Sequence, residues 1–440
     1  MNSTYSTLPL GEKIAQIRKA KGLSLENVAD AIGKSAAFLS RLERGMTECS
    51  SEELAAIKKC LGIEGAPLLE HELSLYRNRI IVCRDLSIAE RYGESEAMLK
   101  EMSVIMELPF EHSLFVMYLM LEASFVLSAG FKKANQDSKL KEDAPLAAEE
   151  MLVKAEPVLG SVSDEALYMY HCVKGRVCYI KQDDKNALKH YLLARNTNCE
   201  FANEFDLLAN IGAAYYFAGK LCKSLIYLEL AKTSYKGSIA DLRWMFLNYT
   251  VGVCYLCLGD YGKAKDLLDK NLEQARSIVN GEQVIAETLI RLGMACQGTN
   301  NYEESIRYFD QAFEYKAGHR HIACLSYKAD SFRHMKELDK CQEVLEQGRA
   351  LADGDKMGTL YLDTIGSLMT LDNGDSVNYL ENTAIPFFRA STAADRYYAI
   401  YLCNELEAYY KRKRTKTKAW AIAATARDIY KDMYEGDIEF

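Results

Sequence analysis

Residues 24 to 45 of the 440-residue chain read SLENVADAIGKSAAFLSRLERG and contain two short amphipathic patterns. Ser24 and Ser35 each stand directly before one pattern, and serine is favoured there because its side chain accepts a free amide of the helix start. Gly33 and Gly45 stand directly after the patterns, where glycine often ends a helix. The stretch therefore predicts two helices joined by a tight turn, the geometry that lets the second helix enter the major groove of DNA.

Apolar residues at helical spacing extend this pair to four helices within residues 1–62. We expect the following side chains to face the core of this small domain: Leu10, Ile14, Ile17, Leu25, Val28, Ala29, Ile32, Leu39, Leu42, Leu54, Ile57 and Leu61. Nine Lys and Arg stand against seven Asp and Glu in the same residues, so net charge alone barely favours a nucleic-acid partner. A plain helical domain with solvated bases is the alternative interpretation.

The order of these residues resembles the lambda-repressor-like, or XRE, helix-turn-helix family. The resemblance rests on Ile17-Arg18, Lys21-Gly22-Leu23-Ser24, Val28-Ala29 and Leu39-Ser40-Arg41-Leu42-Glu43-Arg44-Gly45. It implies that the second helix of the pair reads double-stranded DNA, with Arg41 able to reach guanine, Arg44 placed for a phosphate, and two alanines near thymine methyl groups. The DNA-binding residues that it implies are Lys34, Ser35, Ala36, Ala37, Phe38, Ser40, Arg41 and Arg44.

Two positions within the family pattern need their own interpretation. The family usually has glutamine directly after the Ser24 position, where it contacts a phosphate, and here Leu25 stands there. That contact is in question, although the backbone amides of the helix start can still bind a phosphate. Arg18 and Glu43 occupy the positions of a buried ion pair in the family, so the resemblance implies a structural role for them.

The pattern changes after residue 62. Gly62, Gly65 and Pro67 indicate a hinge, with Pro67 suited to the first turn of the next helix. The charged stretch from Leu68 to about Tyr92 predicts one long helix that connects two domains. The polar stretch Lys132 to Asp143 is the most loop-like part of the remaining chain.

One spacing pattern then returns five times. Each copy has a head residue, usually glycine, followed by selected residues 12, 16 and 19 positions later, and the heads lie 36 to 41 residues apart. The copies are Gly175, Ala187, Tyr191 and Ala194; Gly212, Ser224, Leu228 and Ala231; Gly252, Ala264, Leu268 and Asn271; Gly293, Ser305, Phe309 and Ala312; and Ala329, Cys341, Leu345 and Gly348. This pattern resembles the tetratricopeptide repeat, a helical hairpin of ~34 residues whose small residues permit close packing. Gly366 is expected to open a sixth, shortened copy.

The predicted fold class is therefore all-α, with an N-terminal lambda-repressor-like helix-turn-helix domain followed by a right-handed tetratricopeptide-repeat solenoid. We expect four segments: a DNA-binding domain at 1–66, a linker helix and degenerate repeats at 67–160, ligand-binding repeats at 161–355, and C-terminal capping and possible dimerisation helices at 356–440. Atypical helix pairs at the ends would cap the solenoid.

The first helices of stacked repeats form a concave wall, and fixed offsets from each repeat head point into it. Asn210 can donate to and accept from a peptide backbone, and Arg291, at the same offset, can hold a carboxylate. Tyrosine adds stiff apolar area with a polar tip. The predicted peptide-binding residues are Arg176, Tyr179, Asn210, Tyr216, Arg291, Gln297, Tyr327 and Asp330, and Arg333 shares an offset with Gln297. The alternative for Asn210 is a packing role.

The domain order resembles the peptide-sensing quorum regulators of Gram-positive bacteria, the Rgg, PlcR, PrgX and NprR group. Asn210-Ile211-Gly212 looks like the stretch that carries the peptide-backbone asparagine of that group. The resemblance implies a transcription regulator that binds an operator as a homodimer and responds to a short signalling peptide. An alternative is a regulator whose repeats dock a protein partner. A third is a protein-inhibiting adaptor like the repeat-built phosphatase-type regulators, against which the intact motif from Ser35 to Gly45 argues.

Composition favours a folded cytoplasmic protein. Apolar residues make up 49% and charged residues 26% of the chain. No run approaches the ~18 consecutive apolar residues of a membrane span, and no secretion signal opens the chain, so the thirteen cysteines are expected to be reduced. No phosphate-binding glycine loop, nucleophile elbow or definable carboxylate pair occurs, so we expect neither an enzyme nor a cofactor.

Three further motifs have plain interpretations that we prefer. Cys254 and Cys257 form a CxxC pair, but no second pair accompanies them, so packing is favoured over metal. His319, His321 and Cys324 resemble a ligand trio, and solvated imidazoles are favoured there. Six bases lie between Lys411 and Lys418. They could touch DNA phosphates in a dimer, but a solvated turn is favoured.

Overall fold

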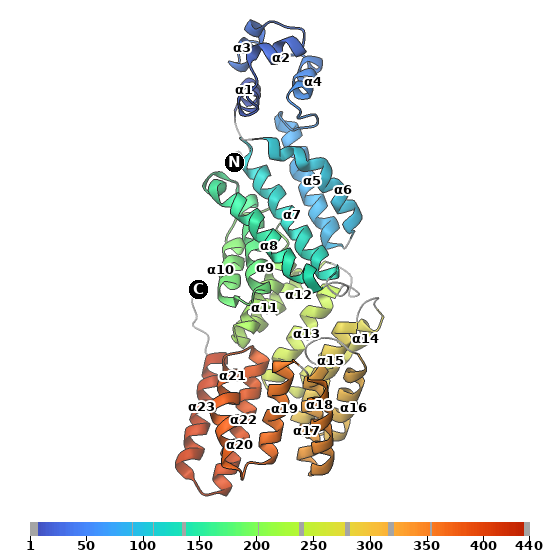
Figure 1. Ribbon diagram of the computed structural model, residues 1–440, viewed down its shortest axis with the longest axis vertical. Helices are drawn as coiled ribbons and strands as arrows, with labels where there is room; N and C mark the ends of the chain where they lie inside the picture. The colour runs from blue at the N-terminus through green and yellow to red at the C-terminus, as the bar shows by residue number, and fades with distance from the viewer. Residues whose placement is uncertain are drawn as a thin grey trace. The chain divides into compact units, whose positions relative to one another are not determined.

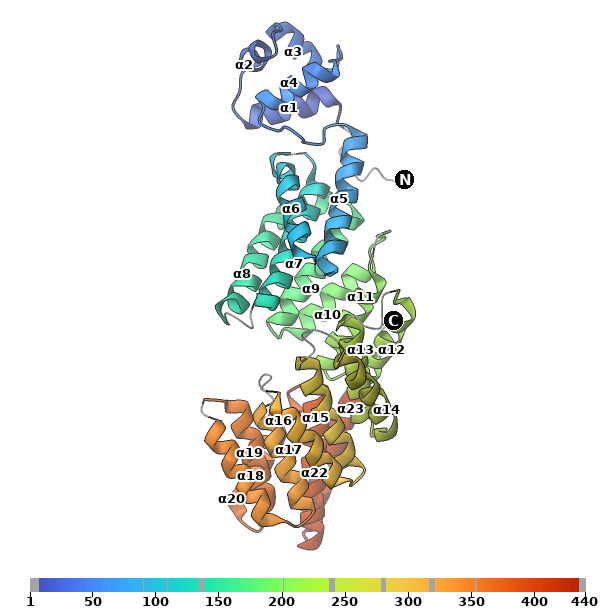
Figure 2. The same cartoon turned by 90° about the vertical axis from the view of Figure 1, so that its right-hand side faces the viewer.

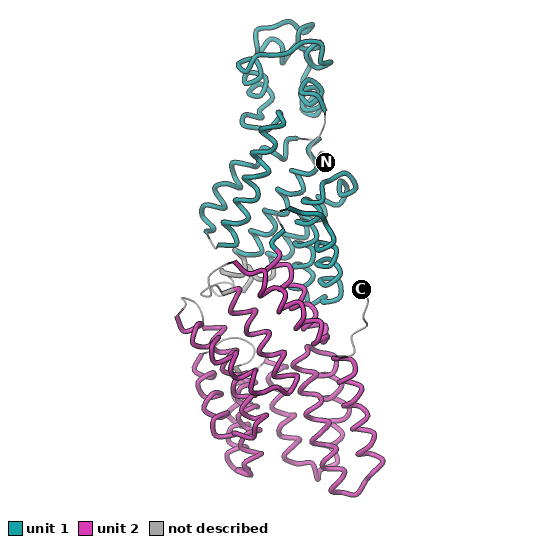
Figure 3. The backbone as a smooth tube through the Cα atoms, turned by 180° about the vertical axis from the view of Figure 1, so that it is seen from behind, with its two compact units in different colours: residues 1–203 teal, residues 204–440 magenta. Residues whose placement is uncertain are grey.

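The computed structural model describes residues 8–89, 91–108, 110–133, 138–200, 202–236, 242–277, 282–315, 321–352 and 354–434. Within these ranges the regular structure is helical and no strand occurs, which confirms the predicted all-α fold class. The chain divides into two compact units, residues 1–203 and 204–440 (Figure 3). This division falls inside the segment 161–355, and the four-segment division by role stays a prediction.

The N-terminal part of the first unit contains the four short helices that the sequence predicts (Figure 1). They are α1 (Leu10–Ala20), α2 (Leu25–Ala31), α3 (Ala36–Glu43) and α4 (Ser51–Cys60). The Ser24 hydroxyl accepts a hydrogen bond from the Asn27 amide at 3.0 Å, and the Ser35 hydroxyl accepts one from the Phe38 amide at 3.2 Å. Both serines therefore cap their helices, and the turn between α2 and α3 is built as expected.

We call the domain formed by α1 to α4 the head. Its apolar core is completed by residues from outside these four helices. Leu108, which is 2% exposed, packs into the same apolar cluster as Ile14 and Leu39. Lys13 of α1 is 3% exposed, donates a hydrogen bond to the Leu68 carbonyl at 3.0 Å, and lies 3.3 Å from the Glu111 carboxylate. The head is thus attached to the following helices through a buried amine and shared apolar packing.

The segment 62–67, predicted as a hinge, makes further contacts with the helix that follows it. The Tyr76 hydroxyl donates to the Gly65 carbonyl at 2.5 Å, and the Glu72 carboxylate accepts from the Lys58 amine at 2.8 Å and from the Leu68 amide at 2.9 Å. Pro67 precedes the next helix rather than lying in its first turn. The segment is tied on both sides, since its polar groups find partners in the helix that follows.

The remaining helices of the first unit pack as antiparallel neighbours. They are α5 (Glu70–Ile88), α6 (Tyr92–Met102), η1 (Ser103–Glu107), α7 (His112–Lys133), α8 (Ser138–Ala155), η2 (Glu156–Ser161), α9 (Asp164–Ile180) and α10 (Asp184–Arg195). The helix predicted to reach about Tyr92 ends at Ile88. The loop predicted at 132–143 is wrong for the described residues there, because α7 extends to Lys133 and α8 begins at Ser138; residues 134–137 lie outside the described ranges.

The second unit is a series of helical hairpins (Figures 1 and 2). The pairs are α11 (Glu204–Phe217) with α12 (Leu221–Ser234), α13 (Leu242–Cys257) with α14 (Tyr261–Ala275), α15 (Glu282–Gly298) with α16 (Tyr302–Glu314), and α17 (His321–His334) with α18 (Leu338–Leu351). Then follow α19 (Lys356–Met369), the continuous stretch α20 (Gly374–Tyr379), η4 (Leu380–Ala384) and α21 (Ile385–Arg389), and the last pair α22 (Ala393–Arg412) and α23 (Lys416–Tyr434).

The repeated spacing has a direct packing cause. A Cβ atom added to Gly293 would lie 2.5 Å from the Phe309 ring, which is closer than carbon atoms can approach. The same relation joins Gly175 with Tyr191, Gly212 with Leu228 and Gly252 with Leu268. Each of these four glycines therefore lets the large side chain 16 positions later press against the first helix of its hairpin.

The sixth copy fits the repeat spacing only in part, and three of its buried positions start one residue earlier than Gly366. Gly366 is partly exposed, and the residues 12 and 16 positions after it are exposed. Ile365, Val377 and Ala384 have the repeat spacing and are buried instead. Gly366 was predicted as the head of this copy because the other heads are small residues, and Ile365 is not small.

Candidate nucleic-acid interface and ligand wall

The predicted DNA-reading side chains lie along one outer side of α3 and its preceding turn. Lys34, Ser35, Ala37, Arg41 and Arg44 are exposed, whereas Leu39 and Leu42 of the same helix are buried. Ala36, Phe38 and Ser40 are partly exposed. The helix therefore offers an accessible face of small and basic residues, as a helix that enters a major groove requires.

The three bases of this face differ in their contacts. The Lys34 amine lies 2.6 Å from the Glu53 carboxylate and 5.3 Å from the centre of the Phe38 ring. The Arg44 guanidinium donates to the Ser40 carbonyl at 3.1 Å and to its hydroxyl at 3.0 Å. Arg41 makes no ion pair or side-chain hydrogen bond with the described residues. It is therefore the base that can bind DNA without breaking an intramolecular contact of this kind.

Arg18 and Glu43 form a two-point ion pair between α1 and the end of α3. The Arg18 Nε and Nη2 atoms donate to the two Glu43 oxygens at 2.7 and 2.9 Å, and both side chains are about nine-tenths buried. Arg18 also donates to the Leu23 carbonyl at 2.7 Å. The hydrogen bond with Glu43 raises the pKa of the guanidinium above its usual value. This pair holds the C-terminal end of α3, which we call the reading helix because it is predicted to read DNA.

The predicted wall residues of α17 are engaged by the chain's own helix α22. The Tyr401 hydroxyl donates to the Asp330 carboxylate at 2.7 Å, and the Arg333 guanidinium donates to the Glu405 carboxylate at 2.9 Å and to Asp330 at 2.7 Å. Tyr327 packs edge-on against Tyr398, with ring centres 6.0 Å apart. The α17 part of the predicted wall is therefore covered by α22 in this structure.

Arg291 lies in a closed polar network rather than on an open wall. It is 2% exposed, and its Nε donates to the Tyr249 hydroxyl at 3.2 Å, while that hydroxyl donates to the Glu287 carboxylate at 3.0 Å. Burial opposes the charge, but the surrounding tyrosine oxygens and Glu287 raise the pKa of Arg291 well above its usual value. The guanidinium is thus held charged inside the unit.

The other predicted peptide-binding residues do not lie together on one surface. Asn210 is exposed on α11, so it does not share an open surface with the buried Arg291. Gln297 donates to the Tyr327 carbonyl and to the Ser331 hydroxyl, both at 2.9 Å. Arg176 and Tyr179 belong to the first unit, where Arg176 donates to the Ser128 hydroxyl at 3.0 Å. Burial raises the pKa of Tyr179 to about 12.

Several first helices of the second unit contribute residues to one interior cluster. We define the interior cluster as Tyr216 of α11, Tyr249 of α13, Arg291 of α15, Tyr327 of α17 and Tyr361 of α19; Tyr249 is partly buried and the other four are buried. On the α22 side, Asp395 accepts from the Tyr361 hydroxyl at 2.7 Å, and Tyr398 packs 5.5 Å from the Tyr361 ring. Tyr249, Tyr361 and the α22 residues were missed from sequence because they lie off the repeat offsets used.

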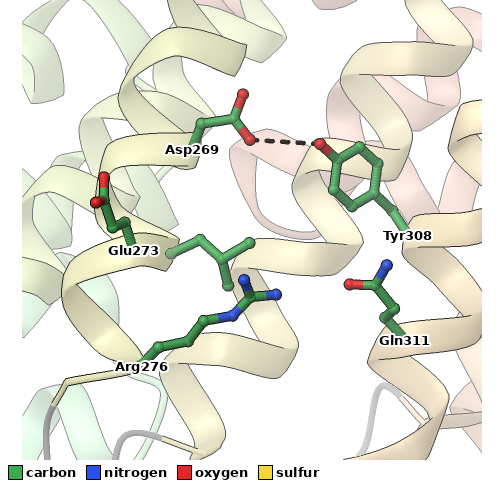
Figure 4. A pocket seen from close by; sticks show the side chains of 6 residues that line it. Asp269, Glu273, Arg276, Tyr308 and Gln311 are labelled. Atoms are coloured by element: carbon green, nitrogen blue, oxygen red, sulfur yellow. Dashed lines mark hydrogen bonds between the residues drawn. The ribbon is translucent and has the colours of Figure 1, made fainter.

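A shallow pocket lies on the other side of the repeats, between second helices. Figure 4 shows Asp269, Glu273 and Arg276 on or next to α14 and Tyr308 and Gln311 on α16, with the Tyr308 hydroxyl 3.4 Å from Asp269. Burial raises the pKa of the Asp269 carboxyl above its usual value. No residue of the predicted wall lines this pocket.

The remaining motifs fall into the core or the exposed surface. Cys254 and Cys257 are fully buried, and burial raises the pKa of Cys254 to about 12. In the described ranges no three His, Cys, Asp or Glu side chains are grouped to hold a metal ion. His319 and the side chain of His321 lie outside the described residues. The bases from Lys411 to Lys418 are all exposed. None of the described helices is long and apolar enough to cross a membrane.

Two family models match the chain. A helix-turn-helix model matches residues 14–68, and a tetratricopeptide-repeat model matches residues 245–316. The chain therefore carries an XRE-type helix-turn-helix domain and tetratricopeptide repeats, which confirms both resemblances. No protein of curated function matches the sequence.

Solved structures share the fold over most of the chain. A Rap protein complexed with Competence and Sporulation Factor is 15% identical, with a TM-score of 0.62 over 82% of this chain and 98% of that one. The apo form of the quorum sensor NprR from B. thuringiensis is 16% identical, with a TM-score of 0.61 over 80% and 98%. NprR in complex with its cognate peptide NprX is 16% identical, with a TM-score of 0.58 over 81% and 99%. At these identities the likeness shows a shared fold.

The ion pair beneath the reading helix gives a stability prediction. Glu43→Ala should lower the local free energy of unfolding of the head by ~3–5 kcal/mol, because it leaves the Arg18 charge buried without its partner. Hydrogen exchange of α1 to α4 in the full chain measures this quantity. Glu48→Ala, at an exposed position of the head, is the matched control and should change exchange little. Equal exchange in the two variants would refute the structural role.

Proposed function

We propose that the chain is a transcription regulator that binds an operator as a homodimer through its helix-turn-helix domain and responds to a short linear peptide bound by its repeats. The observation that carries the DNA-binding half is the exposed face of α3, which holds Arg41 without a partner in the described residues and rests on the Arg18–Glu43 pair. The shared fold with the quorum sensor NprR supports the peptide-binding half.

Selection of bound duplexes from a random DNA pool tests the DNA-binding half. We expect the full chain to select a two-fold-symmetric site and to sediment as a dimer, because each single head offers few contacts and pairing multiplies them. The isolated segment 1–66 should bind only weakly, and the loss of Leu108 from its core would weaken it further. An unsymmetric half-site bound by a monomer would contradict the proposal.

The two arginines of the reading helix should differ in their effects. Arg41→Ala should relax selection at one base position, at a cost of ~1–3 kcal/mol of discrimination, because a base contact carries sequence information. Arg44→Ala should weaken all sequences alike and lower the salt dependence, because a phosphate contact does not. Anisotropy titrations of matched and mismatched duplexes at several salt concentrations measure both effects. Identical, uniform losses in the two variants would show that α3 is placed wrongly in the groove.

The peptide-binding half is supported by the chemistry of the interior cluster and by Asn210. A buried arginine with several tyrosines suits a carboxylate and apolar side chains, and an exposed asparagine beside the repeat head suits a peptide backbone. In this structure α22 covers the part of the wall around Asp330 and Arg333. A peptide that reaches the cluster must therefore compete with, or rearrange, those contacts.

Asn210→Ala should remove the response to peptide at a cost of ~1–3 kcal/mol per lost hydrogen bond while leaving melting temperature and ligand-free DNA affinity unchanged. The reason is that Asn210 is exposed and does not support the core. Calorimetry with a candidate peptide and thermal unfolding are measured on the same variant. Asn378→Ala, at an exposed position of α20, is the control. A lowered melting temperature with normal peptide binding would assign Asn210 to packing instead.

A protein partner docked on the repeats is the second candidate. It is favoured by the covered inner wall together with exposed apolar residues on α12, where Ile226 is 59% and Leu230 is 42% exposed. Ile226→Lys would abolish such docking, whereas peptide binding in the interior would be unaffected. A change in DNA affinity caused by a peptide fraction of the host culture favours the first candidate.

A further inference from the structure

The repeats of the second unit close on themselves. Helices α22 and α23, at the end of the chain, contact α13 and α12, which belong to its first hairpins. Three contacts join these distant segments and are called the seam: the Tyr261 and Tyr397 hydroxyls 2.6 Å apart, the Tyr434 hydroxyl donating to the Cys257 carbonyl at 2.9 Å, and the Arg396 guanidinium packed on Gly219.

One buried polar group beside the interior cluster is left unsatisfied in the closed unit. The Tyr398 side chain is 4% exposed and packs against the rings of Tyr327 and Tyr361, which also contact each other. Its hydroxyl has no hydrogen-bond partner among the described residues. A buried hydroxyl usually has a partner, because leaving it unpaired costs free energy. The closed interior therefore holds a donor that a ligand could satisfy.

The two sides of α22 are held with different strength. Toward α17 and α19 it makes charged hydrogen bonds, from Arg333 to Glu405 and from Tyr401 and Tyr361 to carboxylates. At the seam the hydrogen bonds are neutral, and burial lowers the pKa of Arg396 below its usual value. Charge-assisted hydrogen bonds are roughly twice as strong as neutral ones. In hydrogen bonding, the seam is therefore the weaker of the two sides.

We propose that the second unit opens at this seam, with α22 remaining anchored on α17 and α19, and that the opening admits a linear ligand to the interior cluster. The ligand class is an extended peptide with a free carboxylate for Arg291, apolar side chains for the tyrosine rings, and an acceptor for the Tyr398 hydroxyl. This inference rests on the proposed function for the identity of the ligand, but the opening itself is a property of the chain alone.

Two glycines provide a matched pair of variants for the test. Gly219 and Gly259 lie in equivalent turns of successive hairpins, with φ of 74° and 77°, so alanine meets similar backbone strain at both. A Cβ atom at Gly219 would lie 2.3 Å from the Arg396 guanidinium, whereas no atom lies within 4 Å of one at Gly259. Gly219→Ala therefore displaces the Arg396 guanidinium from its seam contact, and Gly259→Ala is its control.

The native thiols report the opening without any ligand. Cys257 lies at the seam and is 1% exposed, whereas Cys341 of α18 is fully buried away from it. In the full chain, alkylation by N-ethylmaleimide followed by mass spectrometry should show Cys257 reacting roughly tenfold faster in Gly219→Ala than in Gly259→Ala, with Cys341 equally slow in both. Tyr397→Phe, which removes one seam hydrogen bond, should also speed Cys257 selectively.

The inference is overturned if Cys257 reacts at the same rate in the two glycine variants. It is also overturned if Cys257 and Cys341 always react together, because both would then become exposed only through unfolding of the whole unit. Should Gly219→Ala fail to fold, the rate of Cys257 alkylation is compared between Tyr397→Phe and the unchanged chain. Equal rates would again overturn the inference. Because no peptide enters this assay, its outcome is independent of whether the chain senses one.

Discussion

The close approach of two helices within each hairpin is the constraint on which the second unit depends. At Gly293 a single added carbon would collide with Phe309, and the same tight contact recurs at Gly212 and Gly252. Because three successive hairpins of the second unit are locked at such a point, they stack with a similar geometry and their first helices face the same interior. The interior cluster of tyrosines around Arg291 is a consequence of that repetition, since it takes residues from five such helices.

How much could be predicted from the sequence depends on this constraint. The repeat heads and the serine caps are local signals. A serine cap bonds an amide within one helical turn, and a repeat head contacts a side chain within its own hairpin. Helix α22 carries no such signal, so its return to α13 and its occupation of the wall at Asp330 and Arg333 could not be foreseen. Arg291 was predicted to bind peptide from its offset, but its network depends on Tyr249 and Glu287, which lie off the chosen offsets.

In the head, too, the local structure could be predicted from the sequence and the long-range contacts could not. Its helices and the turn at Gly33 follow from local pattern, whereas the insertion of Leu108 into its core and the burial of Lys13 against Leu68 and Glu111 are long-range contacts. These contacts join the head to residues that follow the predicted hinge within the first unit. They also give a physical route by which a change in α7, which begins beside Glu111, would reach the base of the reading helix, because both ends of that route share one apolar core.

The central claim, that one chain couples a reader of DNA to a receptor for a peptide, is tested most directly by a single affinity. The dissociation constant of the full chain for its selected DNA duplex is measured by anisotropy with and without the small-peptide fraction of the native culture. The account predicts a shift of at least about fivefold in either direction, the usual scale of coupling between two sites, and its loss after protease treatment of the fraction. An unchanged dissociation constant, with the peptide shown to bind the chain, would contradict it.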